Sequence, residues 1–172
     1  MASAAHLVRR FAGSLRPGGP TADDEAWARS QLLPDEARLW ARLSGPDRRH
    51  AVGVARRVER ALGAEATRAV LAAALLHDVG KVEAGLGTYG RVVATLAAAV
   101  AGRDMADRWQ RSRGFTRRVG LYLNHPAIGG DLLAMAGSDP LTEAWAREHH
   151  LPPERWTVPR PVADALKAAD DD

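Results

Sequence analysis

The sequence predicts an all-α protein, a helical bundle of roughly eight helices in a single domain. Alanine is abundant and aromatic residues make up only 5% of the chain. Alanine favours helices, whereas strands prefer β-branched and aromatic residues. Apolar residues recur at helical spacing, and no alternating strand pattern extends beyond a few residues. A length of 172 residues fits one domain, so we expect a flexible leader at 1–22 and a helical domain at 23–172.

The leader ends in a turn-rich segment, GSLRPGGPT at 13–21. Asp23 and Asp24 are expected to cap the first helix, which runs to about residue 32. Further helices are expected at about 35–43, 47–62, 65–78, 90–102, 104–112, 115–123, 126–136, 140–150 and 159–170.

Residues 65–78 are apolar nearly all round, which predicts the central buried helix, ended by Gly80. The helix at 47–62 has an arginine-rich outer face and ends at Gly63, as expected of a C-terminal glycine. Pro126 and Pro140 fall in first helical turns, where proline is tolerated. Ser138 or Asp139 is expected to cap the helix that starts at 140.

The charge and composition narrow the function classes. The formal net charge is +3, and Lys81 and Lys167 are the only lysines. This modest excess favours anionic ligands. The arginines are scattered and do not alternate with aromatic residues, so no specific nucleic-acid signal is present.

Composition also bears on location. The longest nearly apolar run, 92–101, is about half a membrane span, and the N-terminus lacks the apolar segment of a secretory signal. With no cysteine, disulfides and thiolate metal sites are excluded, which suits a reducing compartment. We therefore expect a cytoplasmic protein without membrane contact, whose oligomeric state the sequence leaves open; a homodimer is compatible with it.

Five of the six histidines lie at ends or inner faces of predicted helices. His50 lies on an apolar face, and His77 lies on the buried face of the central helix, directly before Asp78. A carboxylate at the end of the most apolar helix is costly unless a partner neutralises it. The remaining candidates are His125 before Pro126, the pair His149–His150 and Asp170 in the last helix.

Each candidate alone has a simpler explanation. A single buried histidine is usually a hydrogen-bonded core residue, two histidines at a helix end can complement the helix dipole, and Asp170 belongs to an acidic tail. Together they favour a metal centre, because helix bundles build such sites from side chains on facing helices. Adjacent helical residues point about 100° apart, so His77 and Asp78 can serve one centre only if the helix end lies directly over it.

These residues resemble the HD superfamily of metal-dependent phosphohydrolases, which has a His, a His-Asp doublet and a distant Asp. The corresponding segments are DRRHAVGVARRVE around His50, LLHDVGK around the doublet and ALKAAD, which ends at Asp170. NHPAIGGDLL around His125 and EHH at 148–150 look like the extra histidines of dinuclear subfamilies such as the HD-GYP phosphodiesterases. The Gly-Tyr-Pro signature is absent, since LPPERWTVPRP follows His150.

The resemblance implies an HD-domain-like bundle and a dinuclear centre. His50, His77, Asp78 and Asp170 would hold the first metal. Asp78 would bridge to a second metal bound by His125 and by His149 or His150. Imidazole and carboxylate ligands suit Fe or Mn, with Zn, Co, Ni or Mg as alternatives. The metals would activate a water for attack on phosphorus.

The expected activity is hydrolysis of a phosphoester or phosphoanhydride in a nucleotide or small phosphorylated metabolite. Asp78 and Lys81 would be catalytic, and Lys81 would also neutralise phosphate charge; alternatively Lys81 is an exposed lysine at a helix end. GLGTYG at 85–90 matches a dinucleotide fingerprint but lacks the preceding strand. Arg91, at the start of a helix, could approach a phosphate. Two other functions stay open: a mixed-valent di-iron oxygenase, and a non-catalytic nucleotide-binding module.

Overall fold

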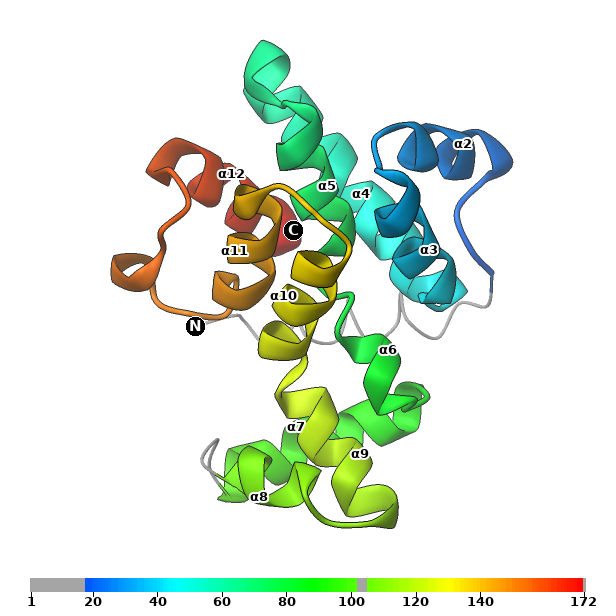
Figure 1. Cartoon of the computed structure of the whole chain (residues 1–172), viewed down its shortest axis with the longest axis vertical. Coiled ribbons are helices and arrows are strands. Elements are labelled where there is room, and N and C mark those ends of the chain that lie inside the picture. The colour runs from blue at the N-terminus through cyan, green and yellow to red at the C-terminus, as the bar shows by residue number, and fades with distance from the viewer. Residues whose placement is uncertain (1–17, 102–104, 172) are drawn as a thin grey trace.

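The computed structural model describes residues 18–101 and 105–171, and these residues form helices with no strand (Figure 1). The all-α prediction is therefore confirmed. The α-helices are α2 (Ala22–Ser30), α3 (Pro34–Arg42), α4 (Gly45–Leu62), α5 (Arg68–Leu76), α6 (Lys81–Ala84), α7 (Thr88–Ala101), α8 (Ala106–Gln110), α9 (Gly114–Leu123), α10 (His125–Met135), α11 (Pro140–Glu148) and α12 (Arg160–Asp171). Most of the expected leader, residues 1–17, lies outside the described residues.

Capping side chains define several helix starts. Thr21, rather than Asp23 or Asp24, caps α2, because its hydroxyl accepts a hydrogen bond from the Asp24 backbone N–H. Asp139 caps α11 by accepting from the Leu141 backbone N–H, as expected. No helix in the described ranges is long and apolar enough to cross a membrane.

The central helix α5 is shorter than predicted at both ends. A 3-10 turn at Gly63–Glu65 follows α4, so α5 starts only after its cap, Thr67. At the other end α5 stops at Leu76, and backbone hydrogen bonds between residues three apart turn the chain through 77–80. A one-turn helix, α6, then begins at Lys81; the sequence did not predict it. The His-Asp doublet therefore lies in a turn directly after the central helix.

The main hydrophobic core surrounds α5, which is buried from Val70 to Leu76. Helices α4 and α11 pack against α5, α12 packs against α4, and α10 packs against α11. A second, smaller core forms between α7, α9 and the end of α6; it contains Ala84, Leu86, Ala94 and Val119. In Figure 1, α7, α8 and α9 lie together at the lower end of the molecule, connected through α6 and α10. The doublet lies where these two parts join.

Candidate metal centre

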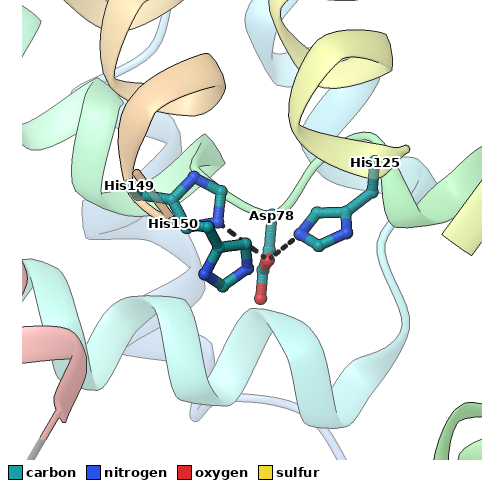
Figure 2. A group of neighbouring side chains, drawn as sticks. All are labelled: Asp78, His125, His149 and His150. Carbon is teal, nitrogen blue, oxygen red and sulfur yellow. Dashed lines mark ion pairs between the residues drawn. The ribbon is translucent and has the colours of Figure 1, made fainter. Parts of the chain in front are cut away.

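The candidate metal centre forms around Asp78, whose residue surface is only 8% exposed. Its Oδ1 lies 3.2 Å from His125 Nε2 and 3.7 Å from His149 Nε2 (Figure 2). Its Oδ2 lies 3.4 Å from His77 Nε2. The two carboxylate oxygens therefore face different imidazoles, an arrangement suited to a carboxylate shared by two metal ions.

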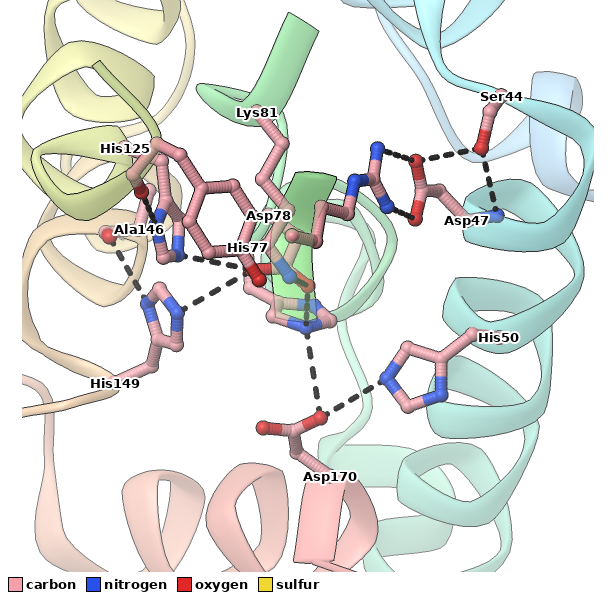
Figure 3. Close-up of polar contacts among 12 residues, drawn as sticks. Ser44, Asp47, His50, His77, Asp78, Lys81, His125, Ala146, His149 and Asp170 are labelled. Atoms are coloured by element: carbon pink, nitrogen blue, oxygen red, sulfur yellow. Dashed lines mark hydrogen bonds and ion pairs between the residues drawn. The ribbon is translucent and has the colours of Figure 1, made fainter. Parts of the chain in front are cut away.

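We call the group on the Oδ2 side the first half-site; it consists of His50 on α4, His77 at the end of α5, Asp170 on α12 and the shared Asp78 (Figure 3). His50 Nε2 lies 3.0 Å from Asp170 Oδ1, and His77 Nε2 lies 3.6 Å from the same oxygen. Ligand atoms of His50, His77 and Asp78 all lie within 4.8 Å of one another. Helices α4, α5 and α12 thus bring residues up to 120 positions apart into one cluster.

The second half-site consists of His125, His149, His150 and the shared Asp78. Their ligand atoms again all lie within 4.8 Å of one another. His125 is the first residue of α10, and His149 is the cap of α11. The exposed His150 has its ring centroid 5.2 Å from that of His125 and 4.0 Å from that of His149. All seven predicted ligands therefore lie in one cluster, and both histidines of the pair belong to it.

Backbone carbonyls define the tautomer of three imidazoles. Nδ1 of His77 lies 2.9 Å from the Ala74 carbonyl, and Nδ1 of His125 lies 2.7 Å from the Tyr122 carbonyl. Nδ1 of His149 lies 3.0 Å from the carbonyl oxygen of the residue three positions earlier. A carbonyl oxygen only accepts, so Nδ1 carries the proton in each ring, and Nε2 of the neutral ring is a lone-pair donor atom.

These three Nε2 atoms, in His77, His125 and His149, are buried and have no hydrogen-bond partner. A buried polar atom without a partner is costly, so several in one place require an explanation. Histidine metal ligands commonly present one nitrogen to the ion while the other donates to a backbone carbonyl. The donor atoms, their tautomers and the shared carboxylate therefore fit a metal ion.

The charges of the first half-site reinforce one another. Burial alone would lower the pKa of His77, but the negative charges of Asp78 and Asp170 raise it to about 9. Burial alone would raise the pKa of Asp78, but the positive charges of Lys81 and His77 hold it well below its usual value. Asp78 is therefore ionised at neutral pH, as a metal ligand must be.

Two imidazoles of the second half-site favour the neutral form. Burial lowers the pKa of His125, against the opposing effect of Asp78. Loss of hydration, with the repulsion that a proton on His149 or His125 would exert, lowers the pKa of His150. A neutral imidazole is the form that binds a metal.

Lys81 lies in the site rather than on the exposed surface. Its ammonium group forms an ion pair with Asp78 Oδ2, and only 12% of its side chain is exposed. The negative charge of Asp78 raises the pKa of Lys81 against the effect of burial. The structure thus brings one predicted phosphate-binding residue into contact with the shared carboxylate.

Arg91 lies beside the centre without contacting its ligands. Its Nη1 and Nη2 donate to Asp47 at 2.5 and 2.7 Å, and Ser44 Oγ donates to the same carboxylate at 2.6 Å. This bidentate pair links the start of α7 to the first turn of α4. Asp47 was not predicted as a site residue, although it precedes His50 by three residues and therefore shares its helix face.

Gly80 was also missed, since its only predicted role was to end a helix. A Cβ at Gly80 would lie 2.0 Å from the His125 carbonyl oxygen and 2.6 Å from the Gly129 backbone nitrogen. Gly129 is also close, though less tight, because its own Cβ would lie 3.2 Å from the Gly80 nitrogen. This close approach places the turn that carries Asp78 against the start of α10, which carries His125.

Comparison with known proteins gives no further identification of the site. No protein-family model, curated protein or solved structure matches this chain. A functional assignment must therefore be argued from the chemistry of the cluster.

Proposed function

We propose that this protein is a metal-dependent phosphohydrolase with two divalent ions, one in each half-site, and that its resemblance to the HD superfamily reflects this activity. The observation that carries the proposal is the set of three buried, unpartnered Nε2 atoms in His77, His125 and His149 beside one ionised carboxylate. These atoms lie 3.2–3.7 Å from carboxylate oxygens of Asp78 and Asp170, and together they supply ligands for two ions that share Asp78.

The bound ions would supply the nucleophile, because two adjacent divalent ions lower the pKa of a water and stabilise in-line attack on phosphorus. The protein's task is to orient the ligands and to keep Asp78 ionised. Nδ1 of His77, His125 and His149 donates to a backbone carbonyl, which leaves Nε2 of each ring directed at the cluster as the atom that would bind an ion. Lys81 keeps Asp78 ionised, because its positive charge lowers the pKa of that carboxylate.

Lys81 would also bind the phosphate of the substrate. Its ammonium group is paired with Asp78 Oδ2, the oxygen nearest His77 Nε2. If Asp78 Oδ2 served as a metal ligand, the Lys81 ammonium would be available to bind a second anion at the same place. A phosphoryl group next to the metals is the anion that this arrangement suits.

The proposal is tested by metal analysis and turnover on the same preparations. We expect protein purified after growth with iron or manganese to hold two ions per chain and to release phosphate from phosphomonoesters, phosphodiesters or nucleotides. The Asp78→Ala variant should retain neither metal nor activity, because it removes the ligand common to both half-sites. His6→Ala is the matched control, since His6 is the histidine with no place in the predicted ligand set.

Three outcomes would contradict this function. Wild-type protein that holds no transition metal after growth with each ion would remove the site. Asp78→Ala protein that keeps its activity would remove the residue assignment. Iron-dependent oxygen consumption without phosphate release would replace hydrolysis by dioxygen chemistry at the same ligands.

A further inference from the structure

A pocket of about 180 Å³ opens beside the candidate metal centre, between the first turn of α4, α6 and the start of α7. Its polar lining consists of Arg42, Ser44, Asp47, Lys81 and Arg91. Lys81 belongs to both places, because its ammonium group also contacts Asp78 (Figure 3). The Lys81 side chain therefore borders both the pocket and the cluster that would hold the metals.

The lining is positively charged. Among the described residues that line it, Arg42, Lys81 and Arg91 contribute three positive charges and Asp47 one negative charge, while Glu83 and Asp78 pair with Arg42 and Lys81 from outside the lining. A concave surface with excess charge of one sign attracts ligands of the opposite sign.

Two of these cations could exchange their present carboxylate partner for an anionic ligand. Arg42 pairs with Glu83 across the pocket edge at 2.6 Å, but the two side chains are 46% and 41% exposed. Exposed pairs of this kind contribute little to stability and exchange readily with another anion. Lys81 pairs with Asp78, whose carboxylate would instead bind the metal ions. The cations Arg42 and Lys81 are thus the ones open to an anionic ligand.

The third cation has a structural role. Arg91 binds Asp47 through two hydrogen bonds, and the side chains are 23% and 15% exposed. Bidentate arginine–carboxylate pairs have fixed geometry. Arg91 and Asp47 therefore form a rigid wall of the pocket between α4 and α7, and the ligand would meet Arg42 and Lys81 on the remaining sides.

We infer that this pocket binds a second anionic group of the substrate, so that the enzyme acts on compounds with two anionic groups, one at the metals and one at Arg42. This inference rests on the proposed function. Among the described residues the lining contains no aromatic ring, and its only large apolar side chains are Val82 and Leu86. The pocket therefore suits a phosphate or carboxylate better than a nucleobase, which proteins hold mainly by stacking.

The test uses phosphonates, which are not hydrolysed, on metal-loaded protein. Methylphosphonate offers one anionic group, phosphonoacetate adds a carboxylate, and methylene- and propylenediphosphonate add a second phosphonate at two spacings. Isothermal titration calorimetry measures the dissociation constant of each. We expect at least one two-anion probe to bind roughly tenfold more tightly than methylphosphonate, and the better second group identifies the anion.

The variant Arg42→Ala separates the pocket from simple chelation by the metals. It should remove the advantage of the two-anion probe and leave methylphosphonate binding unchanged, while Arg42→Lys should restore part of it. Arg38→Ala is the matched control, because Arg38 lies one turn earlier on α3, is 78% exposed and pairs with Asp35. The control should keep the full advantage.

The outcomes distinguish this inference from the proposed function. Equal binding of one-anion and two-anion probes, or an advantage that survives Arg42→Ala, overturns the pocket while the metal centre stands. Failure to hold metal or to bind methylphosphonate at all overturns the proposed function, and the inference that depends on it falls with it.

Discussion

The two half-sites share Asp78 but are built from different chemistry. The first contains a second carboxylate, Asp170, whose Oδ1 lies 3.0 Å from His50 Nε2 and therefore gives that imidazole a partner without any metal. The second has only imidazoles besides Asp78, and Nε2 of His125 and of His149 has no hydrogen-bond partner.

Because of this difference, the first half-site should contribute to the stability of the metal-free fold as well as to metal binding, and the second mainly to metal binding. The first half-site lies among α4, α5 and α12, where its ion pairs also join helices of the main bundle. The second lies where α10 starts and α11 ends, and its imidazoles have no carboxylate besides Asp78, 3.2 and 3.7 Å away, so they should stabilise the metal-free fold less. Carboxylates favour harder ions and imidazoles favour Fe or Zn, so the half-sites should also differ in metal preference.

The largest effect should come from removing one ligand of each half-site. Both Asp170→Asn and His125→Ala should reduce the metal content from two ions to one and abolish most of the turnover. Asp170→Asn should also lower the free energy of unfolding of the metal-free protein by about 1–3 kcal/mol. The reason is that residue 170 would lose the negative charge that faces His50. His125→Ala should change that free energy less.

Elemental analysis and chemical denaturation of the metal-free proteins measure these two effects separately. Asp131→Asn is a suitable control, because Asp131 lies on α10 with its side chain 70% exposed. If His125→Ala destabilised the metal-free protein as strongly as Asp170→Asn, the distinction between the half-sites would be lost.

A smaller and more selective effect is expected from Gly80→Ala. The new methyl group would overlap the His125 carbonyl oxygen, 2.0 Å from its ideal position, so the start of α10 must move away from Asp78. Affinity for the second ion should fall by about 10- to 100-fold, since supporting contacts of metal ligands have effects of this size. The first ion should bind as before, which metal titration monitored by calorimetry would detect.

Gly87→Ala is the control for this change, because a Cβ at Gly87 would meet no atom within 4 Å. A Gly80→Ala protein that binds both ions with wild-type affinity would show that the close approach of Gly80 to α10 does not position His125. Circular dichroism of both variants would show whether the helical fold persists.

The last effect concerns the pH dependence of the metal-free protein. The folded-state pKa of His77 is about 9, above its ordinary value of 6.5, because Asp78 and Asp170 favour the charged ring. A raised pKa stabilises the fold fully below pH 6.5, and this stabilisation is lost as the pH rises to about 9. The Tm of metal-free protein should therefore fall across this interval.

Metal binding should show the opposite trend, since the ion competes with the proton on His77 and its affinity should rise with pH up to about 9. His77→Gln should flatten the thermal profile between these two pH values. A wild-type profile that is already flat there would mean that His77 stays neutral in the metal-free protein and that the first half-site carries less charge.

The sequence by itself determined the all-α fold, most helix positions and the group of candidate ligands. These features depend on local patterns: helical periodicity, capping residues such as Asp139 and the order of histidines and aspartates. Where local signals competed, the expectation was wrong. Thr21 rather than Asp23 or Asp24 caps α2, and the chain turns at 77–80 instead of continuing α5 as far as Asp78.

Only the tertiary structure decided how the ligands are divided. Helices far apart in the chain determine which Asp78 oxygen faces which imidazole. They also bury Lys81 and bring Arg91 to Asp47. Position 80 requires glycine only because α10 passes directly beside it and leaves no space for a Cβ. Periodicity within one helix carries no information about the distance to another, so the half-sites and the pocket could not be predicted from the sequence.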